Sequence, residues 1–360
     1  MSGTESHFPR SYRSARANFL AACKAGDLGV TSRVHPGAKG QDGKPLFIDT
    51  TTIGSVEAEK ALLLISGTHG VEGYFGSAVQ TGLIREGIAG AVPDGTKLVM
   101  LHALNPYGFA FDRRVNEDNA DINRNFVDHK HPPDNPAYAA LAEWIAPKDI
   151  SPDSMRAANA HLRAYAEEKG AFALQEAVSR GQFQFADGIY YGGARPSWSA
   201  QMLSDILKDD FGHVRRLVVI DFHTGLGEHA SAEMITEELP GSVAYKRQKR
   251  IWGELVKSSE AGESVSAPLV GTIDKRVSKW ASRRELTFAA LEAGTKPVRE
   301  VFNALRKDNW LYCFAENPGA QTEAIRGEIR GAFYPETKEW KRAVFAHAEN
   351  AVRQGLAALA

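Results

Sequence analysis

Four short apolar runs along the chain predict strands that are buried on both faces. They occupy residues 61–65, 98–104, 216–221 and 286–291, and each is nearly continuous in apolar character. Continuous runs of this length, bounded by turn residues, are typical of the central strands of a covered sheet, whereas half-exposed strands alternate apolar and polar positions. The chain therefore contains the strands of a buried central sheet.

Apolar residues at helical spacing lie between and after these strands. The pattern covers residues 12–25, where Gly26 ends it, then about 73–86, and finally a long amphipathic tail at 337–359. Strands that alternate with helices predict an α/β fold, in which a mixed, largely parallel central sheet is flanked by helices on both faces.

The segment from about 132 to 180 has a different character. It reads as helices punctuated by prolines, and alanine, glutamate and leucine dominate residues 155–178. We interpret this segment as a helical insertion or a helical face of the fold. Because no internal repeat or shift in composition divides the chain, we expect residues 1–360 to form a single domain.

The balance of charge argues against a nucleic-acid or membrane partner. The chain has 43 Lys and Arg against 44 Asp and Glu, which gives a formal net charge of −1. Such a protein has no overall field that would attract nucleic acid or an anionic membrane surface. A small or peptide-like substrate fits this neutrality better, while the oligomeric state stays open.

Cysteine usage and the opening residues bear on the compartment. Cys23 and Cys313 are the only two cysteines, too few for a disulfide scaffold or a thiolate zinc site, and they favour a reducing compartment. The first 19 residues mix charge and polarity without the apolar run of a secretory signal, and no stretch approaches the roughly 18 apolar residues of a membrane span. We therefore expect a cytoplasmic protein.

Two of the predicted strands are followed by residues that can bind a metal. The first leads into a glycine-flanked turn that carries His69 and Glu72, and the third leads to His223. Ligands in open α/β sheets bind outside the carboxyl ends of the strands. Two histidines and one carboxylate with an open fourth position are typical of catalytic zinc. The His-x-x-Glu spacing alone is a weak signal, since His69 could instead cap a turn.

A third segment completes a pattern of known order. Asn-Pro-Tyr-Gly at 105–108 is followed by Arg114 and then by Asp-Ile-Asn-Arg-Asn at 121–125. With the histidines, Glu72 and a later Glu292, this order resembles the zinc carboxypeptidases. It looks most similar to a poorly characterised bacterial branch of that superfamily, and it is related to the aspartoacylase and succinylglutamate desuccinylase deacylases. The resemblance spans about two thirds of the chain.

The resemblance implies a role for each matching residue. His69, Glu72 and His223 match the ligands of one zinc ion per chain, and Asp121 matches a carboxylate that orients the first histidine. Asn123 and Arg124 match the pair that grips a substrate carboxylate, although Arg124 could instead brace its loop against an acidic neighbour. Arg114 matches the arginine that stabilises the oxyanion, with Arg113 as its rival.

Glu292 matches the general base. It closes a buried apolar strand, where partial desolvation would raise its pKa toward the range of a base. The alternatives are that Glu292 pairs with an arginine such as Arg283, and that Glu316 is the base. For the tyrosine that closes over the substrate in many relatives, Tyr190 and Tyr191 are the candidates, and Tyr191 is our choice.

These residues predict a zinc-dependent hydrolase that cleaves an amide bond next to a carboxylate-bearing residue, with a small peptide or an N-acyl amino acid as substrate. A metallocarboxypeptidase is the leading interpretation, and residues 1–360 would be its catalytic domain. One alternative is an N-acyl amino acid deacylase of the aspartoacylase type. Another is a catalytically inactive zinc-containing binding protein, although a pure binder needs neither a base nor an oxyanion arginine. A serine hydrolase is excluded by the lack of a G-x-S-x-G elbow.

Overall fold

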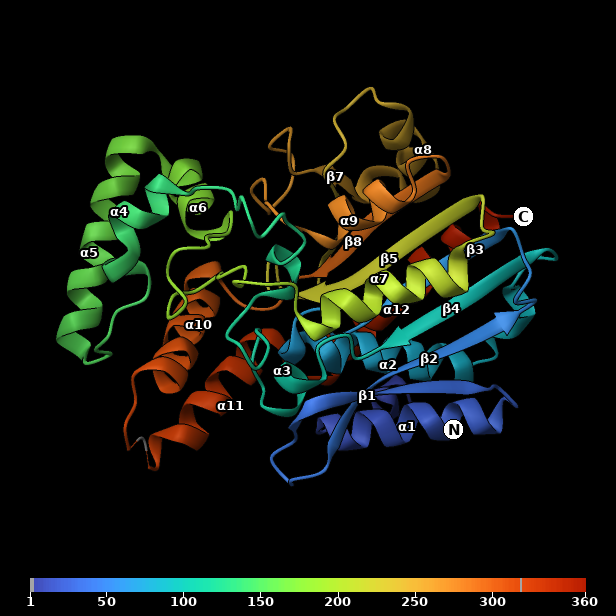
Figure 1. Cartoon of the computed structure of the whole chain (residues 1–360), viewed down its shortest axis with the longest axis horizontal. Coiled ribbons are helices and arrows are strands. Elements are labelled where there is room, and N and C mark those ends of the chain that lie inside the picture. Colours follow the sequence, from blue (N-terminus) through green and yellow to red (C-terminus); the bar gives the residue numbers. More distant parts are fainter. Residues whose placement is uncertain (1–2, 318) are drawn as a thin grey trace.

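The computed structural model describes residues 3–317 and 319–360. Its centre is a sheet of eight strands in the order β1-β2-β4-β3-β5-β8-β6-β7 (Figure 1). The pairs β3–β4, β3–β5, β5–β8 and β6–β7 are parallel, and the other three pairs are antiparallel. This confirms the mixed, largely parallel central sheet. The strands are β1 (Val30–Lys39), β2 (Pro45–Gly54), β3 (Lys60–Ile65), β4 (Thr96–His102), β5 (Arg216–Thr224), β6 (Ala232–Thr236), β7 (Val256–Ser258) and β8 (Glu285–Ala293).

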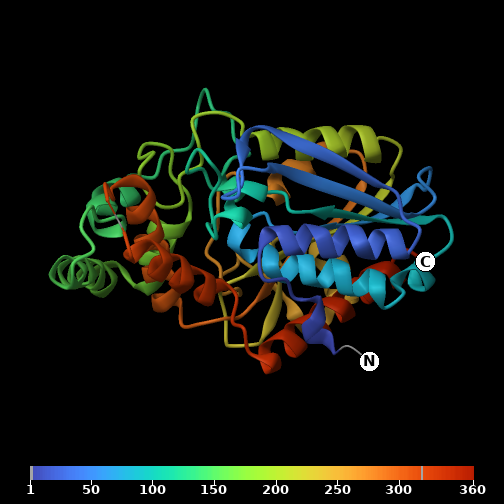
Figure 2. The same cartoon turned by 90° about the horizontal axis from the view of Figure 1, so that it is seen from below.

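Helices cover both faces of the sheet. In β3, Leu62 and Leu64 pack in one apolar cluster with α1, α2 and α12, while Leu63 and Ile65 pack in a second cluster with α7 and α9. Successive side chains of a strand point to opposite faces, so a run buried on both faces must be apolar throughout. Figure 2 shows α1 and α2 on one side of the sheet and α7, coloured yellow-green, on the other. These helices are α1 (Tyr12–Ala25), α2 (Gly73–Arg85), α7 (Trp198–Phe211), α8 (Val243–Trp252), α9 (Ile273–Trp280) and α12 (Lys338–Ala357).

A further group of helices lies beyond the carboxyl ends of the parallel strands (Figure 1). It consists of α4 (Pro136–Ile145), α5 (Pro152–Lys169), α6 (Ala171–Ser179), α10 (Val298–Cys313) and α11 (Gln321–Phe333), which share an apolar cluster of their own. Helices α4 and α5 each begin with a proline, next to the capping residues Asn135 and Ser151. A proline in the first turn costs no hydrogen bond, which explains the proline punctuation of this segment. The short helix α3 (Pro106–Ala110) connects β4 to the site.

The structure contains more strand than the apolar runs predict. Strands β1 and β2 form an antiparallel ribbon at one edge of the sheet, and β6 and β7 form the other edge. Strand β1 includes Pro36 and Gly37 and is mostly exposed, so its sequence carries no apolar run. In addition, β5 and β8 extend to Thr224 and Ala293, so His223 and Glu292 lie within strands rather than after them.

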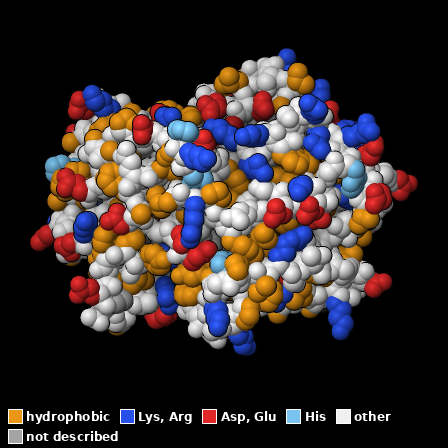
Figure 3. Space-filling view, in the orientation of Figure 1, with side chains coloured by type: hydrophobic (Ala, Val, Ile, Leu, Met, Phe, Trp, Pro, Cys, Tyr) orange, Lys and Arg blue, Asp and Glu red, His pale blue; other side chains and the backbone are white. Residues whose placement is uncertain are grey.

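The surface agrees with the neutral composition. Acidic and basic side chains are interspersed over the face shown in Figure 3. Within residues 3–317 and 319–360, each helix is too short or too polar to span a bilayer.

Candidate active site

The sheet register brings the predicted site residues together. Strands β3, β5 and β8 are adjacent and parallel, so their carboxyl ends meet at one edge. His223 of β5 is directly opposite Glu292 of β8. Residues that pair in register on neighbouring strands project from the same face, so these two side chains point the same way. His69 and Glu72 follow β3. His69 caps the start of a short 3-10 helix, η2 (Gly70–Glu72), and Glu72 is its last residue.

The imidazoles of His69 and His223 converge on the carboxylate of Glu72. The Nδ1 atom of His69 lies 2.9 Å from Glu72 Oε1, and the Nδ1 atom of His223 lies 3.1 Å from Glu72 Oε2. The two Nδ1 atoms are 3.1 Å apart. One ligand atom from each of the three residues lies within 4.8 Å of the other two, and all three side chains are buried. These residues could hold a metal ion.

Each histidine also contacts a carboxylate through its Nε2 atom, on the side of the ring away from Glu72. His69 Nε2 faces Asp121 Oδ1 at 3.2 Å, and His223 Nε2 faces Asp221 Oδ2 at 2.8 Å. Thr68 donates a hydrogen bond to the other oxygen of Asp221 at 2.8 Å. Carboxylates in these positions fix which ring nitrogen carries the proton and leave both Nδ1 atoms free for a metal. Asp221 was not predicted, although its position two residues before His223 places both on one face of β5.

Burial and charge set the protonation of this group. Burial alone would raise the pKa of Glu72, but the imidazoles of His69 and His223 hold it well below its usual range. Burial alone would lower the pKa of His223, but Asp221 and Glu72 raise it well above its usual value. The site is therefore an ion-paired cluster in which the carboxylate of Glu72 is charged.

Glu292 has the opposite environment. Its side chain is 8% exposed, and its Oε1 accepts a hydrogen bond of 2.8 Å from the backbone N–H of Leu226. Burial, together with the negative charge of Glu72, raises the pKa of Glu292 to about 8. Arg283, its alternative partner, is exposed. Glu316, the competing base, is also exposed and does not line the cavity described below.

Arg114 joins the candidate metal ligands to Asp121. Its Nε donates to Asp121 Oδ2 at 3.0 Å, and its Nη1 donates to Glu72 Oε1 at 3.1 Å. Its Nη2 lies 2.7 Å from His69 Nε2. A guanidinium has five N–H groups, and two of them donate to Asp121 and Glu72, so others remain for a ligand in the cavity.

The predicted carboxylate clamp lies beside this cluster. Arg124 is 2% exposed and donates to the backbone carbonyl oxygens of Ser179 and Asn123. Three of its five N–H groups are used in this way, and within the described residues it forms no ion pair with a carboxylate. Asn123 Oδ1 accepts a hydrogen bond of 2.8 Å from Ile273 N–H, which holds it against the start of α9.

Two predicted substrate-binding residues lie outside the cavity. Arg113 is buried against Asp308, with its Nε 3.0 Å from Asp308 Oδ2, and donates to Asn119 at 2.9 Å, so its charge is already compensated. Tyr191 does not line the cavity, and its backbone carbonyl accepts a hydrogen bond of 2.7 Å from Asp121 N–H.

Tyr190 takes the place predicted for Tyr191. Its ring lies 5.2 Å from the guanidinium carbon of Arg114 and 5.5 Å from that of Arg124, and it lines the cavity. The φ angle of Tyr190 is +56°, a left-handed conformation that is uncommon for a residue with a side chain. This local backbone turn puts Tyr190 rather than its neighbour into the cavity. The sequence gives no sign of it beyond the glycines on either side.

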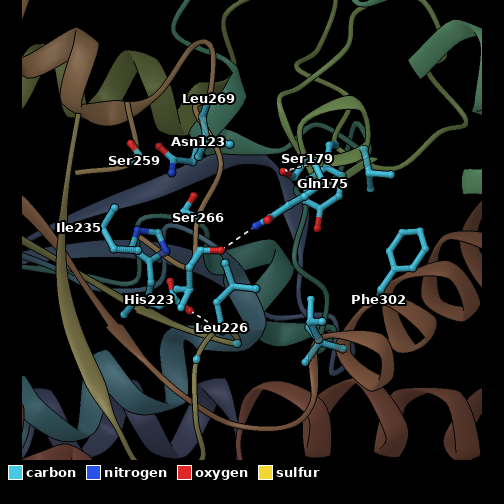
Figure 4. Close-up of a pocket in the computed structure, with 18 of the residues that line it drawn as sticks. Asn123, Gln175, Ser179, His223, Leu226, Ile235, Ser259, Ser266, Leu269 and Phe302 are labelled. Atoms are coloured by element: carbon cyan, nitrogen blue, oxygen red, sulfur yellow. Dashed lines mark hydrogen bonds between the residues drawn. The ribbon is translucent and has the colours of Figure 1, made fainter. Parts of the chain in front are cut away.

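The candidate metal ligands, Glu292, Arg114, Asn123, Arg124 and Tyr190 line one large cavity. Its volume is about 860 Å³, and it reaches from the candidate metal ligands to helices α5, α6 and α10. In Figure 4, Ile235 and Ser259 lie on one side of His223, and Phe302 lies far out on the other side, beyond Leu226. The cavity is large enough for more than the reacting groups of a small substrate.

Comparison with known sequences gives one match at the level of the family. Residues 8–347 match the profile of the family described as "Protein of unknown function (DUF2817)". A comparison with curated proteins found no match.

Several solved structures are similar to this chain at low sequence identity. One is bovine thrombin-activatable fibrinolysis inhibitor in complex with tick carboxypeptidase inhibitor, with 12% identity, a TM-score of 0.50, and coverage of 98% of this chain and 97% of that chain. Another is carboxypeptidase A from Helicoverpa armigera, with 13% identity, a TM-score of 0.43 and coverage of 95% and 75%. A third is succinylglutamate desuccinylase from Chromobacterium violaceum, with 16% identity, a TM-score of 0.39 and coverage of 88% and 73%. The first of these matches, which spans nearly the whole of both chains, confirms the carboxypeptidase-like fold.

Proposed function

Since the chain belongs to the family described as "Protein of unknown function (DUF2817)" and has a carboxypeptidase-like fold, we propose that it is a zinc-dependent hydrolase that cleaves an amide bond next to a carboxylate-bearing residue. A metallocarboxypeptidase is the leading form of this proposal. The observation that carries it is the convergence of two imidazoles and one carboxylate beside a second, separately buried carboxylate, Glu292, in one cavity.

The donor set suits zinc. Zinc in hydrolytic sites takes nitrogen and carboxylate ligands from three residues and keeps one position open. His69, Glu72 and His223 supply such a set, and the carboxylates behind both histidines are the partners that zinc-binding imidazoles usually have. When bound, a zinc ion would polarise the substrate carbonyl and lower the pKa of a water molecule.

Residues of the chain would then carry out the proton transfer, stabilise the oxyanion and bind the substrate carboxylate. Glu292 takes a proton from the attacking water and passes it to the nitrogen of the leaving amine, for which a pKa near neutrality is suited. The unused N–H groups of Arg114 donate to the developing oxyanion, a contribution whose loss elsewhere costs about 3 to 4 kcal/mol. Asn123 and Arg124 bind the carboxylate of the leaving residue.

A pair of variants tests the proposal by separating metal binding from turnover. His223→Ala should lose zinc, measured as metal content per chain, because a catalytic site with two ligands holds zinc weakly. Glu292→Gln should keep about one zinc per chain, while kcat for peptides with a free terminal carboxylate falls by at least about 100-fold.

Three outcomes would change the proposal. Unchanged zinc in His223→Ala would remove the metal site, and near-normal turnover in Glu292→Gln would remove Glu292 as the base. Hydrolysis of N-acyl amino acids without any cleavage of peptides would replace the carboxypeptidase by the deacylase.

A further inference from the structure

The two ends of the cavity differ in chemistry. The end next to Asn123 is polar, because Asn123 contacts the start of α9, where Thr272 donates to Glu237. Its lining includes two acidic and three hydroxyl-bearing side chains: Glu237, Asp274, Thr236, Ser259 and Ser266.

The other end is apolar and is built by helices that the proposed reaction does not use. It begins at Leu226, whose N–H is bound to Glu292, and extends to Phe302 (Figure 4). Its walls come from α5, α6 and α10, so the helical segment that follows the clamp forms one side of it. Most of the side chains that these helices contribute to the cavity are apolar, although Arg163 and Arg299 also line it. We call this end the apolar lobe, and define it by Leu162, Leu174, Val178, Val301, Phe302 and Leu305.

The apolar lobe is a preformed space with a fixed wall. Leu162, Val178, Val301 and Leu305 are at most 8% exposed and belong to the core shared by α4, α5, α6, α10 and α11. Leu174 and Phe302 pack against this core but are only partly buried, so they present apolar surface to the cavity. A cavity wall of this kind favours a ligand with apolar surface of its own.

The position of the apolar lobe selects which part of a substrate enters it. This step rests on the proposed function, in which Asn123 and Arg124 hold the leaving residue. Asn123 contacts the start of α9 at the polar end, whereas Arg124 donates to Ser179 at the end of α6. A leaving residue held by both therefore lies between the two ends, and the acyl side of the scissile bond extends past Glu292 toward Leu226. We propose that the apolar lobe binds an apolar group on the acyl side of the scissile bond and so determines substrate specificity.

Two substrates that differ only in the acyl group test this proposal. N-(3-phenylpropanoyl)alanine carries an aromatic group where N-acetylalanine has none, and it represents both an N-acyl amino acid and a peptide whose penultimate residue is phenylalanine. With the zinc-loaded full chain, we expect kcat/KM for the phenylpropanoyl compound to be at least about tenfold higher, since burying an aromatic ring removes much apolar surface from water. Equal values would overturn the proposal and leave the hydrolase standing.

Variants then test whether the preference for the phenylpropanoyl compound depends on the apolar lobe. Leu174→Asp should lower kcat/KM for the phenylpropanoyl compound at least about tenfold, and leave N-acetylalanine within about twofold, because a charge there opposes an apolar ligand. Phe302→Ala, a milder change, should act in the same direction. The matched control is Phe172→Asp, on the same helix as Leu174, because Phe172 is half exposed and does not line the cavity. Equal losses on both substrates in Leu174→Asp and Phe302→Ala would overturn the proposal.

Binding of the two compounds to a variant that does not cleave them tests the apolar lobe independently of the proposed reaction. Calorimetry on zinc-loaded Glu292→Gln should show at least about tenfold tighter binding of N-(3-phenylpropanoyl)alanine than of N-acetylalanine, and the added Leu174→Asp change should remove the difference. If this preference is present but no amide is cleaved by the wild type, the apolar lobe stands and the proposed function fails. If both compounds bind equally, the apolar lobe is not a specificity site.

Discussion

Arg124 shows how one side chain combines a structural and a binding role. Two of its N–H groups hold the carbonyl of Ser179 at the end of α6, and a third holds the carbonyl of Asn123. Within the described residues this buried guanidinium donates only to carbonyl oxygens, which are dipoles rather than counter-ions, so no carboxylate pairs with it directly. The substrate carboxylate of the proposed function would supply such a counter-ion.

A substitution that keeps the charge tests this role. In Arg124→Lys, kcat/KM for substrates with a free terminal carboxylate should fall by about tenfold or more, because an ammonium group does not form the bidentate pair. Substrates with that carboxylate amidated should change little. The measured quantity is the ratio of the two kcat/KM values.

Arg113→Lys is the matched control for this experiment. Arg113 is equally buried but is paired with Asp308 outside the cavity, so its loss should lower thermal stability without changing the ratio. A ratio that is unchanged in Arg124→Lys as well would mean that Arg124 only braces the loop.

At the scale of elements, the turn between β3 and α2 positions two candidate ligands by close contact with α3. The N–H groups of Gly70 and Val71 donate to the carbonyls of Arg114 and Arg113. A Cβ atom on Gly70 would lie 2.0 Å from the backbone carbon of Gly108. Only glycine allows η2 and α3 to approach this closely, so the Asn-Pro-Tyr-Gly segment is a support for His69 and Glu72.

Gly70→Ala should therefore displace the turn. We expect a loss of about 1 to 3 kcal/mol in the free energy of unfolding, as for other overpacked positions, together with weaker zinc binding. Urea unfolding and zinc titration measure the two effects. Gly90→Ala in η3 (Ile88–Ala91) is the control, because a Cβ atom there has no neighbour within 4 Å. Equal behaviour of the two variants would refute this account of the turn.

The sequence predicted those elements that are marked by a pattern of apolar residues within the element itself. The central strands are apolar on both faces, and the resemblance supplied the order of the site residues, so their convergence followed from the parallel sheet. Strands β1, β2, β6 and β7 were missed because the strands at and next to the two edges of the sheet are held by pairing with a neighbour, and pairing leaves little trace in composition. The sequence did not indicate that Tyr190 rather than Tyr191 lines the cavity, because the left-handed backbone of Tyr190 has no sequence signal of its own. The apolar lobe arises from α5, α6 and α10, which are far apart in the chain.

At the scale of the whole molecule, the candidate site lies where the sheet meets the second group of helices, at the base of the cavity. Glu72, Asp121, Asp221 and Glu292 are all buried within this boundary. The histidines and Arg114 pair with Glu72, Asp121 and Asp221, whereas Glu292 forms no ion pair within the described residues and is repelled by the charge of Glu72 when it ionises. A divalent cation would compensate this charge, so the stability of the whole fold should depend on metal and on pH.

Glu292 determines the sign of the pH dependence in the metal-free protein. Its pKa is about 8 in the folded state against an ordinary value of 4.5. Between these values the folded protein binds a proton that the unfolded chain has released, so the free energy of unfolding falls as the pH rises. We expect a loss of a few kcal/mol between about pH 5 and pH 8 that is absent in Glu292→Gln. His223 and Glu72 also titrate in both proteins and respond to the charge of Glu292, so the difference between the two curves reports Glu292 together with its effect on these two neighbours.

Urea unfolding with a chelator, at several pH values, measures this difference. Saturating zinc should reduce it, because a cation beside Glu292 favours the ionised carboxylate and lowers its pKa. Zinc should also raise the stability of the wild type, by about 2.7 kcal/mol at a concentration 100 times its dissociation constant. Parallel curves for the wild type and Glu292→Gln in chelator would show that Glu292 is ionised at neutral pH without metal. In that case burial is not what prepares it to act as a base.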